Sequence, residues 1–194
     1  MKTWKDIDGW FDFQDVYESV VRMSPTNPRV DFVEVGVWLG KSTIFMLDMI
    51  TKHRPNIHLH VVDTWKGNPG VDFMLEQVAK AGGSLLPNFI QNVKDCGYGN
   101  LLDKSLHIHE GLSVEVAETF KEKSVSFVFI DGDHSYQAVK DDILAWKPKI
   151  RKGGRIAGHD YNPSNDSYKG LIQAVQECCP DFYPTSTSCW VEHL

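Results

Sequence analysis

Short apolar runs rich in β-branched residues alternate with stretches of helical periodicity along this chain. The runs that we expect to form strands occupy residues 30–35, 57–63, 105–109, 125–131 and 154–159. Between the last two runs, apolar side chains from Val139 to Ile150 recur at the spacing of one helix face. Strands joined by helical crossovers lie parallel in one sheet. The sequence therefore predicts an α/β fold, a doubly wound, Rossmann-like and mostly parallel sheet with helices on both faces, and a last strand near residues 187–194 that is antiparallel.

The domain organisation follows from the length and from two unusual segments. We expect a single domain over residues 1–194, because this length suits one hydrophobic core. Residues 1–28 are predicted to form an N-terminal cap helix that carries an aromatic cluster at residues 10–13. Residues 65–104 are long for a plain crossover and hold a Gly-Asn-Pro-Gly turn and two weak helical patterns around Gly82. We interpret this second segment as an insert or lid.

Charge and composition exclude several classes of partner. The net charge is -6 and no cluster of Lys or Arg is present, so we expect no nucleic-acid partner. No apolar run approaches the ~20 residues of a membrane span, and the N-terminus has no apolar signal core. The four cysteines show no metal-binding or disulfide spacing. We therefore expect a cytoplasmic protein with reduced thiols and a small-molecule partner, and a homodimer is compatible with the sequence.

The turn after the first strand reads Glu34-Val-Gly36-Val-Trp38-Leu-Gly40-Lys-Ser42-Thr43, and three ligands compete for it. A P-loop needs one more residue between its glycines and would place phosphates beside Glu34, although residues 127–131 resemble a Walker B strand. A dinucleotide fingerprint needs glycine where Trp38 stands, because the pyrophosphate approaches the backbone closely there. Neither alternative fits the turn well.

The third ligand is S-adenosylmethionine, which carries a cationic sulfonium and an anionic carboxylate. Glu34 is expected near the cationic part, and free N–H groups around Ser42 and Thr43 can receive the carboxylate. At ~4 Å and an effective dielectric constant near 20, one opposite charge is worth ~4 kcal/mol before desolvation. Asp63 ends the second predicted strand and can accept hydrogen bonds from both ribose hydroxyls, although a dinucleotide would use it in the same way.

These motifs carry a family resemblance. The turn from Glu34 to Ser42 resembles motif I of the class I S-adenosylmethionine-dependent methyltransferases. The sequences Ile-Asp-Gly-Asp-His at residues 130–134 and Gly-Gly-Arg-Ile-Ala-Gly-His-Asp-Tyr at residues 153–161 resemble a small methyltransferase-domain group. That group is related to the catechol, caffeoyl-CoA and sugar O-methyltransferases, and the likeness spans about residues 32–175. It implies a seven-stranded sheet.

The resemblance also assigns cofactor-binding residues. The turn after strand one would hold the methionine part, Asp63 the ribose, and the turn after strand three, with Ser113, the adenine. Trp65 either stacks on the adenine or covers the sheet. The full set of expected cofactor-binding residues is Glu34, Gly36, Trp38, Gly40, Ser42, Thr43, Asp63, Trp65, Ser113 and Asp131.

A second group of polar residues lies at the ends of the fourth and fifth predicted strands. Asp131, His159 and Asp160 are expected to converge there, and their donors suit Mg²⁺ or another divalent cation. In the metal-dependent relatives the position of His159 carries an aspartate, so the imidazole also admits Mn²⁺ or Zn²⁺. His134 stands where catechol-type relatives have a lysine base, and histidine titrates near neutral pH. We expect His134 and Asp131 to be catalytic.

The sequence thus predicts O-methylation of a small hydroxylated acceptor, such as a sugar, polyol or phenol, with S-adenosylmethionine and with a metal as a further option. Two alternatives stay open at this point: a P-loop-like nucleotide-binding module, and a methyltransferase fold that binds a ligand without catalysis. The remaining histidines at positions 58, 60, 107 and 109 alternate along strands two and three. They are expected at solvated edge positions without acidic partners.

Overall fold

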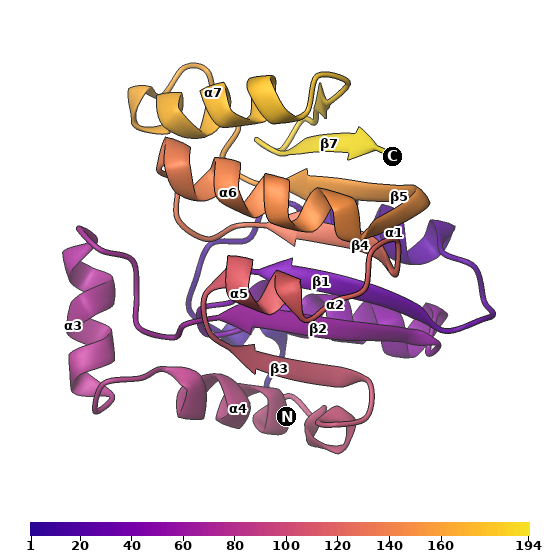
Figure 1. Cartoon of the computed structure of the whole chain (residues 1–194). Coiled ribbons are helices and arrows are strands. Elements are labelled where there is room, and N and C mark those ends of the chain that lie inside the picture. Colours follow the sequence, from indigo (N-terminus) through magenta and orange to yellow (C-terminus); the bar gives the residue numbers. More distant parts are fainter.

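The structure is a computed structural model that describes residues 1–194. Its centre is a seven-stranded sheet in the order β3-β2-β1-β4-β5-β7-β6 (Figure 1). The pairs β1–β2, β1–β4, β2–β3 and β4–β5 are parallel, whereas β7 runs antiparallel to both β5 and β6. The predicted doubly wound α/β sheet with an antiparallel last strand is confirmed.

The strands coincide closely with the apolar runs of the sequence. They are β1 (Val30–Val35), β2 (Ile57–Asp63), β3 (Leu106–Glu110), β4 (Val125–Ile130), β5 (Ile150–Gly158), β6 (Tyr183–Pro184) and β7 (Trp190–His193). The strand order reverses at β1 and β4, whose carboxyl ends lie side by side because Val35 pairs with Ile130. In open α/β sheets such a reversal point is where ligands bind.

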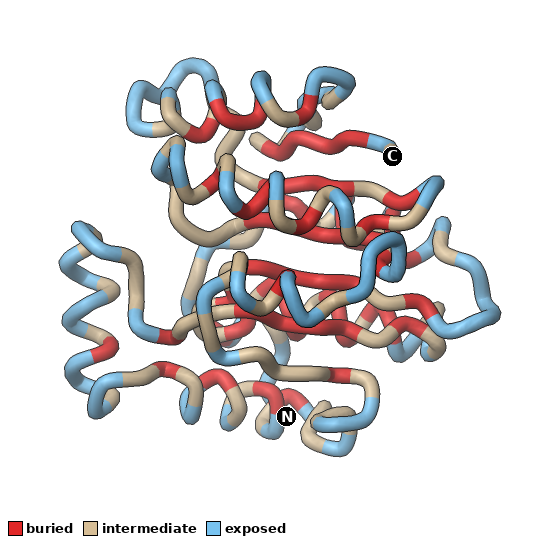
Figure 2. Tube along the Cα trace, in the orientation of Figure 1, coloured by how far each residue is buried: buried red, intermediate tan, exposed pale blue.

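Helices cover both faces of the sheet. One face carries α1 (Gln14–Met23) and α2 (Lys41–His53), and α4 (Leu86–Asp95) joins the same 26-residue apolar cluster through Phe89 and Val93. The other face carries α5 (Ser113–Glu118), α6 (Tyr136–Trp146) and α7 (Lys169–Cys178) over a 17-residue cluster. In Figure 2 the buried residues follow the strands and the inner sides of the helices. Strands buried on both faces explain the continuous apolar runs of the sequence.

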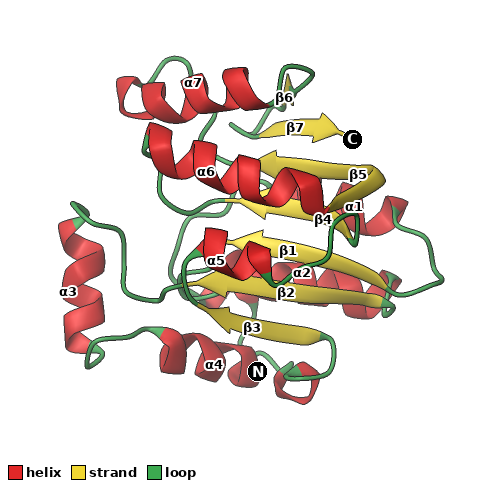
Figure 3. Cartoon of the chain, in the orientation of Figure 1, coloured by secondary structure: helices red, strands yellow, loops and turns green.

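The helix α3 (Asp72–Lys80) stands apart from the sheet, beyond the carboxyl ends of the parallel strands (Figure 3). Val78 is its only buried residue, and Phe73 and Leu75 are exposed. Together with α4 it forms the two helical elements expected on either side of Gly82. Because little of α3 packs against the core, this helix forms one wall of the space beyond the strand ends.

Two expected boundaries differ in the structure. The helical spacing that continues to Ile150 in the sequence ends as an α-helix at Trp146, because Pro148 cannot donate a backbone hydrogen bond, and a 3₁₀ turn over Lys147–Lys149 leads into β5. The N-terminal helix begins only at Gln14, since the aromatic residues before it pack edge to face with one another and with Phe45. No helix combines the length and hydropathy needed to cross a membrane.

Candidate active site

A cavity of about 920 Å³ lies beyond the carboxyl ends of the parallel strands. Each of the five parallel strands contributes residues at its end or directly after it, including Gly36, Asp63, Gly111, Asp131 and His159. Residues 8–12 of the N-terminal segment and residues between 66 and 74 of the insert line its outer part. The cavity therefore brings together the two groups of polar residues that the sequence places at strand ends.

The turn after β1 passes directly against the loop after β4. Gly36 has a φ of 82°, and a Cβ atom at this position would collide with the backbone carbonyl of Asp131. Only glycine fits this combination of left-handed backbone and close approach. Gly36, Trp38 and Ser42 all line the cavity, as predicted for residues that contact the cofactor.

Asp63 holds the same turn from the end of β2. Its carboxylate accepts hydrogen bonds from the backbone N–H of Val37 at 2.7 Å, of Trp38 at 2.9 Å and of Trp65 at 2.7 Å. Asp63 also lines the cavity. A carboxylate has more acceptor positions than these three donors fill, so Asp63 can fix the turn and still receive a ribose hydroxyl.

Glu34 lies elsewhere than expected. Side chains alternate along β1, and Glu34 shares the side of Phe32 that is covered by α1 and α2, so it is 1% exposed and does not line the cavity. Its carboxylate accepts hydrogen bonds from the hydroxyls of Tyr17 at 2.9 Å, Ser42 at 2.6 Å and Thr43 at 2.6 Å. Burial raises the pKa of Glu34 to about 7 despite these three donors. The expectation that Glu34 faces the sulfonium is corrected: it anchors the start of α2.

Three other residues that were expected to contact the cofactor, Gly40, Thr43 and Trp65, are buried beneath the turn. Thr43 is fully buried and Gly40, with a φ of 89°, lies against the ring of Phe89. Trp65 is fully buried, stacks obliquely on Phe89 with centroids 5.4 Å apart, and donates from its indole N–H to the carbonyl of Trp38. None of these three lines the cavity, so stacking of Trp65 on adenine is excluded by its burial.

Ser113 lines the cavity as expected, and so does Asp142, which was not predicted as a site residue. The indole N–H of Trp146 donates to the Ser113 hydroxyl at 2.8 Å. Asp142, on the same helix, is 7% exposed and also lines the cavity, and burial raises its pKa to about 6 although Ser113 donates a hydrogen bond to it. The sequence could have indicated Asp142, because it stands three residues after Val139 and is therefore a carboxylate on the apolar face of α6.

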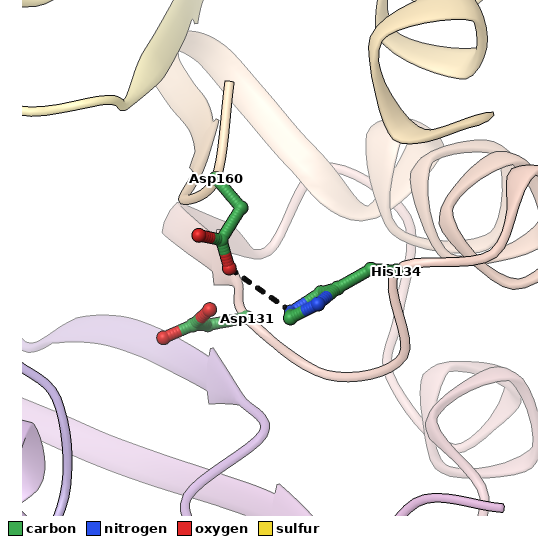
Figure 4. Close-up of side chains that lie close together, drawn as sticks. All are labelled: Asp131, His134 and Asp160. Atoms are coloured by element: carbon green, nitrogen blue, oxygen red, sulfur yellow. Dashed lines mark ion pairs between the residues drawn. The ribbon is translucent and has the colours of Figure 1, made fainter. Parts of the chain in front are cut away.

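Asp131, His134 and Asp160 converge at the ends of β4 and β5 (Figure 4). One ligand atom from each lies within 4.8 Å of those of the other two. The Nε2 atom of His134 lies 3.1 Å from a carboxylate oxygen of Asp160. A set of two carboxylates and one imidazole suits a divalent cation, and a histidine paired with a carboxylate also suits proton transfer.

His159 lies next to this trio, so Asp131, His159 and Asp160 converge as expected, and metal ligation by them stays a prediction with His134 as a further candidate ligand. The Nε2 atom of His159 lies 2.8 Å from Asp12 of the N-terminal segment. Its Nδ1 atom lies 3.7 Å from Asp131 and 3.5 Å from Asp160. Burial alone would lower the pKa of His159, but hydrogen bonds and charges from Asp131 and Asp160 outweigh it and raise the pKa to about 11. The imidazole therefore forms ion pairs with the carboxylates around it.

The N-terminal segment supplies side chains that the sequence analysis named only as a cluster. Asp8, Trp10, Phe11 and Asp12 line the cavity. The ring of Trp10 is 70% exposed and meets Phe73 of α3 edge to face, with centroids 5.5 Å apart. The N-terminal segment and the insert thus touch each other across the outer part of the cavity.

Residues 33–161 match the family model described as a methyltransferase domain. The chain belongs to this methyltransferase family. The match covers the turn after β1, Asp63 and the trio at the ends of β4 and β5, and a methyltransferase domain with these motifs uses S-adenosylmethionine as methyl donor. The nucleotide-triphosphatase alternative is thereby set aside.

Solved structures share the fold of this methyltransferase domain. The O-methyltransferase NovP aligns with a TM-score of 0.67 and 20% identity, over 93% of this chain and 78% of that chain. The calicheamicin methyltransferase CalS11 gives a TM-score of 0.65 and 16% identity over 93% and 76%. A putative caffeoyl-CoA O-methyltransferase from Staphylococcus aureus gives 0.60 and 14% over 96% and 85%. No curated protein shows significant similarity to the chain.

Proposed function

We propose that this methyltransferase transfers a methyl group from S-adenosylmethionine to a hydroxyl oxygen of a small acceptor, a sugar, polyol or phenol. The observation that carries the proposal is the convergence of Asp131, His134 and Asp160 in the same cavity as the cofactor turn at Gly36. Proton-accepting groups beside a methyl donor suit an acceptor whose nucleophile must lose a proton, as a hydroxyl does.

The donor side is formed by the turn after β1 and by the ends of β2 and β3. Gly36 and Ser42 receive the methionine part, Asp63 the ribose hydroxyls, and Ser113 with Asp142 lies on the adenine side. Support comes from their common position on the cavity wall and from the turn that Asp63 fixes by two backbone hydrogen bonds. Because the turn is already held in place, the free energy of cofactor binding is not reduced by the cost of ordering it.

On the acceptor side, His134 is the proposed general base. The 3.1 Å contact with Asp160 orients the imidazole, with the proton on Nε2 and the lone pair of Nδ1 free to take the hydroxyl proton. The resulting imidazolium is stabilised by the Asp160 carboxylate. The oxygen then displaces the neutral thioether of the donor in a single step, so the main task of the protein is to align oxygen, methyl carbon and sulfur.

The trio also fits a divalent cation, because its three ligand atoms converge within 4.8 Å and belong to a mixed carboxylate–imidazole set. Asp131, His134 and Asp160 would hold the ion, which would supply Lewis-acid lowering of the acceptor hydroxyl pKa. One nitrogen of His134 cannot both bind an ion and hold a proton toward Asp160. The two arrangements are therefore distinguishable by experiment.

We further propose that the chain is a single domain in which the N-terminal cap, residues 1–28, and the insert, residues 65–104, act as lids. Support comes from their lining residues and from the edge-to-face contact of Trp10 with Phe73. Such lids would keep bulk water from the reacting oxygen.

Calorimetric titration with S-adenosylmethionine tests the donor side. We expect binding that Asp63→Asn weakens by about tenfold or more, because the turn loses two backbone hydrogen bonds and the ribose its acceptor. Asp181→Asn, an exposed carboxylate away from the cavity, is the matched control. Methyl transfer from labelled donor to a panel of sugars, polyols and phenols then tests the acceptor side, with and without EDTA. No binding of the donor, or binding without transfer to any hydroxyl, would contradict the proposal and would favour a non-catalytic binding role.

A further inference from the structure

The acceptor side of the cavity is strongly acidic. Five carboxylates line this part of the wall, from the N-terminal segment and from the loops after β4 and β5: Asp8, Asp12, Asp131, Asp133 and Asp160. Two lysines also line the cavity: Lys66 follows the end of β2, and Lys41 begins α2 with its side chain beside Gly9, which lies between Asp8 and Trp10. No arginine lines the cavity. An acceptor therefore meets five carboxylates and one nearby lysine on this side.

Negative charge is in excess on this side when no metal is bound. Even with His134 and His159 both protonated, these two residues, Lys41 and the sulfonium of the donor contribute four positive charges against the five carboxylates of the wall. A cleft lined by one sign of charge attracts the opposite sign and repels its own. The preference for a cation is therefore expected of the metal-free protein.

An exposed aromatic surface adjoins these carboxylates. Trp10, 70% exposed, lies between Asp8 and Asp12 in the same segment. Phe73, 44% exposed, meets Trp10 at 5.5 Å and Trp38 at 6.3 Å between ring centroids. Indole faces bind ammonium groups through cation–π attraction, and they also stack on sugar and phenol rings. Carboxylates and an indole together form a surface that favours an amine over an anion.

Resting on the proposed O-methylation, we propose that the acceptor carries a protonated amine beside its hydroxyls, as an amino sugar or a catecholamine does, and that acceptors bearing phosphate or carboxylate are rejected. This sets the chain apart from structures that share its fold. CalS11 is described as a TDP-rhamnose methyltransferase and the Staphylococcus aureus protein as a putative caffeoyl-CoA methyltransferase, and both of those acceptors carry phosphates.

Two series of probes that share a hydroxylated core and carry a positive, neutral or negative substituent test the proposal and separate the two sources of the amine. One series is dopamine, 4-methylcatechol and 3,4-dihydroxybenzoate, and the other is glucosamine, glucose and glucose 6-phosphate. Each probe is titrated calorimetrically into protein saturated with S-adenosylhomocysteine and is then assayed for methyl transfer from labelled donor. We expect the cation to bind about tenfold or more tightly than the anion in the series that fits, and the gap to shrink at high salt.

Two variants test whether the preference for cationic acceptors comes from the carboxylates of the cavity wall. The double variant Asp8→Asn and Asp133→Asn removes two carboxylates without touching the trio or the His159 contacts, and should reduce the cation-to-anion affinity ratio about fivefold or more. Asp72→Asn, on the same helix as Phe73 but outside the cavity wall, should leave the ratio unchanged. Equal or tighter binding of the anions, a ratio that the double variant does not change, or no binding of either amine at millimolar concentration would overturn the inference. Failure to bind S-adenosylhomocysteine or S-adenosylmethionine would instead overturn the proposed function.

Discussion

Two groups of histidines lie on the same sheet in opposite electrostatic surroundings. The histidine ladder lies on neighbouring strands β2 and β3 and consists of His58, His60, His107 and His109. The strand-end pair, His134 and His159, follows β4 and β5 and faces the cavity. Nitrogens within the ladder approach each other at 3.0 Å, His58 to His107 and His60 to His109, and the rings stack. Carboxylates surround the strand-end pair instead.

The titration of the two groups follows the sign of their neighbours. In the ladder, burial and then the adjacent imidazoles lower the pKa of His109 to about 4, and the pKa of His107 is lowered for the same reasons. At the strand ends, Asp131 and Asp160 raise the pKa of His159 to about 11 in spite of burial. His107 and His109 therefore favour the neutral form within a hydrogen-bonded, stacked ladder, whereas His159 favours the charged form among carboxylates.

The largest difference between the groups should appear in catalysis. His134→Gln removes the proposed base, and we expect kcat for methyl transfer to fall by about 10²- to 10⁴-fold while calorimetry shows unchanged binding of S-adenosylmethionine. His107→Gln makes the same chemical change in the ladder and should leave kcat within about twofold. Equal effects of the two substitutions, once both variants are shown to fold, would remove the functional distinction.

A second difference should appear in stability. His159→Gln leaves Asp12, Asp131 and Asp160 close together without their shared cation, and we expect unfolding in urea at neutral pH to become easier by about 2–3 kcal/mol. His58→Gln exchanges one partly exposed imidazole and should cost about 1 kcal/mol or less. A smaller loss for His159→Gln than for His58→Gln would show that the charge of His159 contributes nothing to folding.

The pH dependence of the free energy of unfolding tests the lowered pKa of the ladder residue His109. His109 takes up protons less readily when folded, so its contribution to the free energy of unfolding is complete above the ordinary pKa of ~6.5 and is lost as the pH falls toward about 4. Since solvent screens this partly exposed side chain, we expect a loss of about 2 kcal/mol. Glu34, whose pKa is raised to about 7, acts in the opposite direction between its ordinary value and 7. The measurement is therefore the difference between the parent protein and His109→Gln, from urea unfolding at several pH values. A difference that does not change between pH 7 and pH 5 would contradict the lowered pKa.

The smallest expected effect concerns the one carboxylate of the ladder. Asp31 lies 3.1 Å from His60 and 2.6 Å from Arg29, and although burial raises its pKa, these two partners lower it to about 2. Asp31→Asn should cost about 0.5–1 kcal/mol at neutral pH and less near pH 3, because a part-exposed pair contributes little. Catalysis should not change. A loss of activity in Asp31→Asn would mean that the ladder communicates with the cavity.

Periodicity predicted the elements of this fold well, because strands buried on both faces leave long apolar runs. What the sequence could not supply was the direction of single side chains. Glu34 was expected at the cofactor, yet one step along β1 turns it beneath α2. The expected solvated ladder has an acidic partner, Asp31, that belongs to a neighbouring strand and is distant in the sequence. Asp12, from a segment nearly 150 positions earlier, contacts Nε2 of His159, whereas Nδ1 faces Asp131 and Asp160, and no local motif predicts the first of these contacts. Motifs thus located the residues around the cavity, whereas contacts between distant segments decided which member of each motif faces the cavity.

The hydroxyl of Tyr17 gives the N-terminal helix a role that its position at the far end of the sequence conceals. Because that hydroxyl reaches the buried carboxylate of Glu34, a chain shortened to begin after residue 28 would lose one of the three donors that solvate this acid. The other two donors, Ser42 and Thr43, begin the helix that follows the loop proposed to receive the methyl donor. The N-terminal helix α1 therefore supports the loop after β1 through Tyr17. A different N-terminal segment could replace it only if a hydroxyl reached Glu34 from the same position.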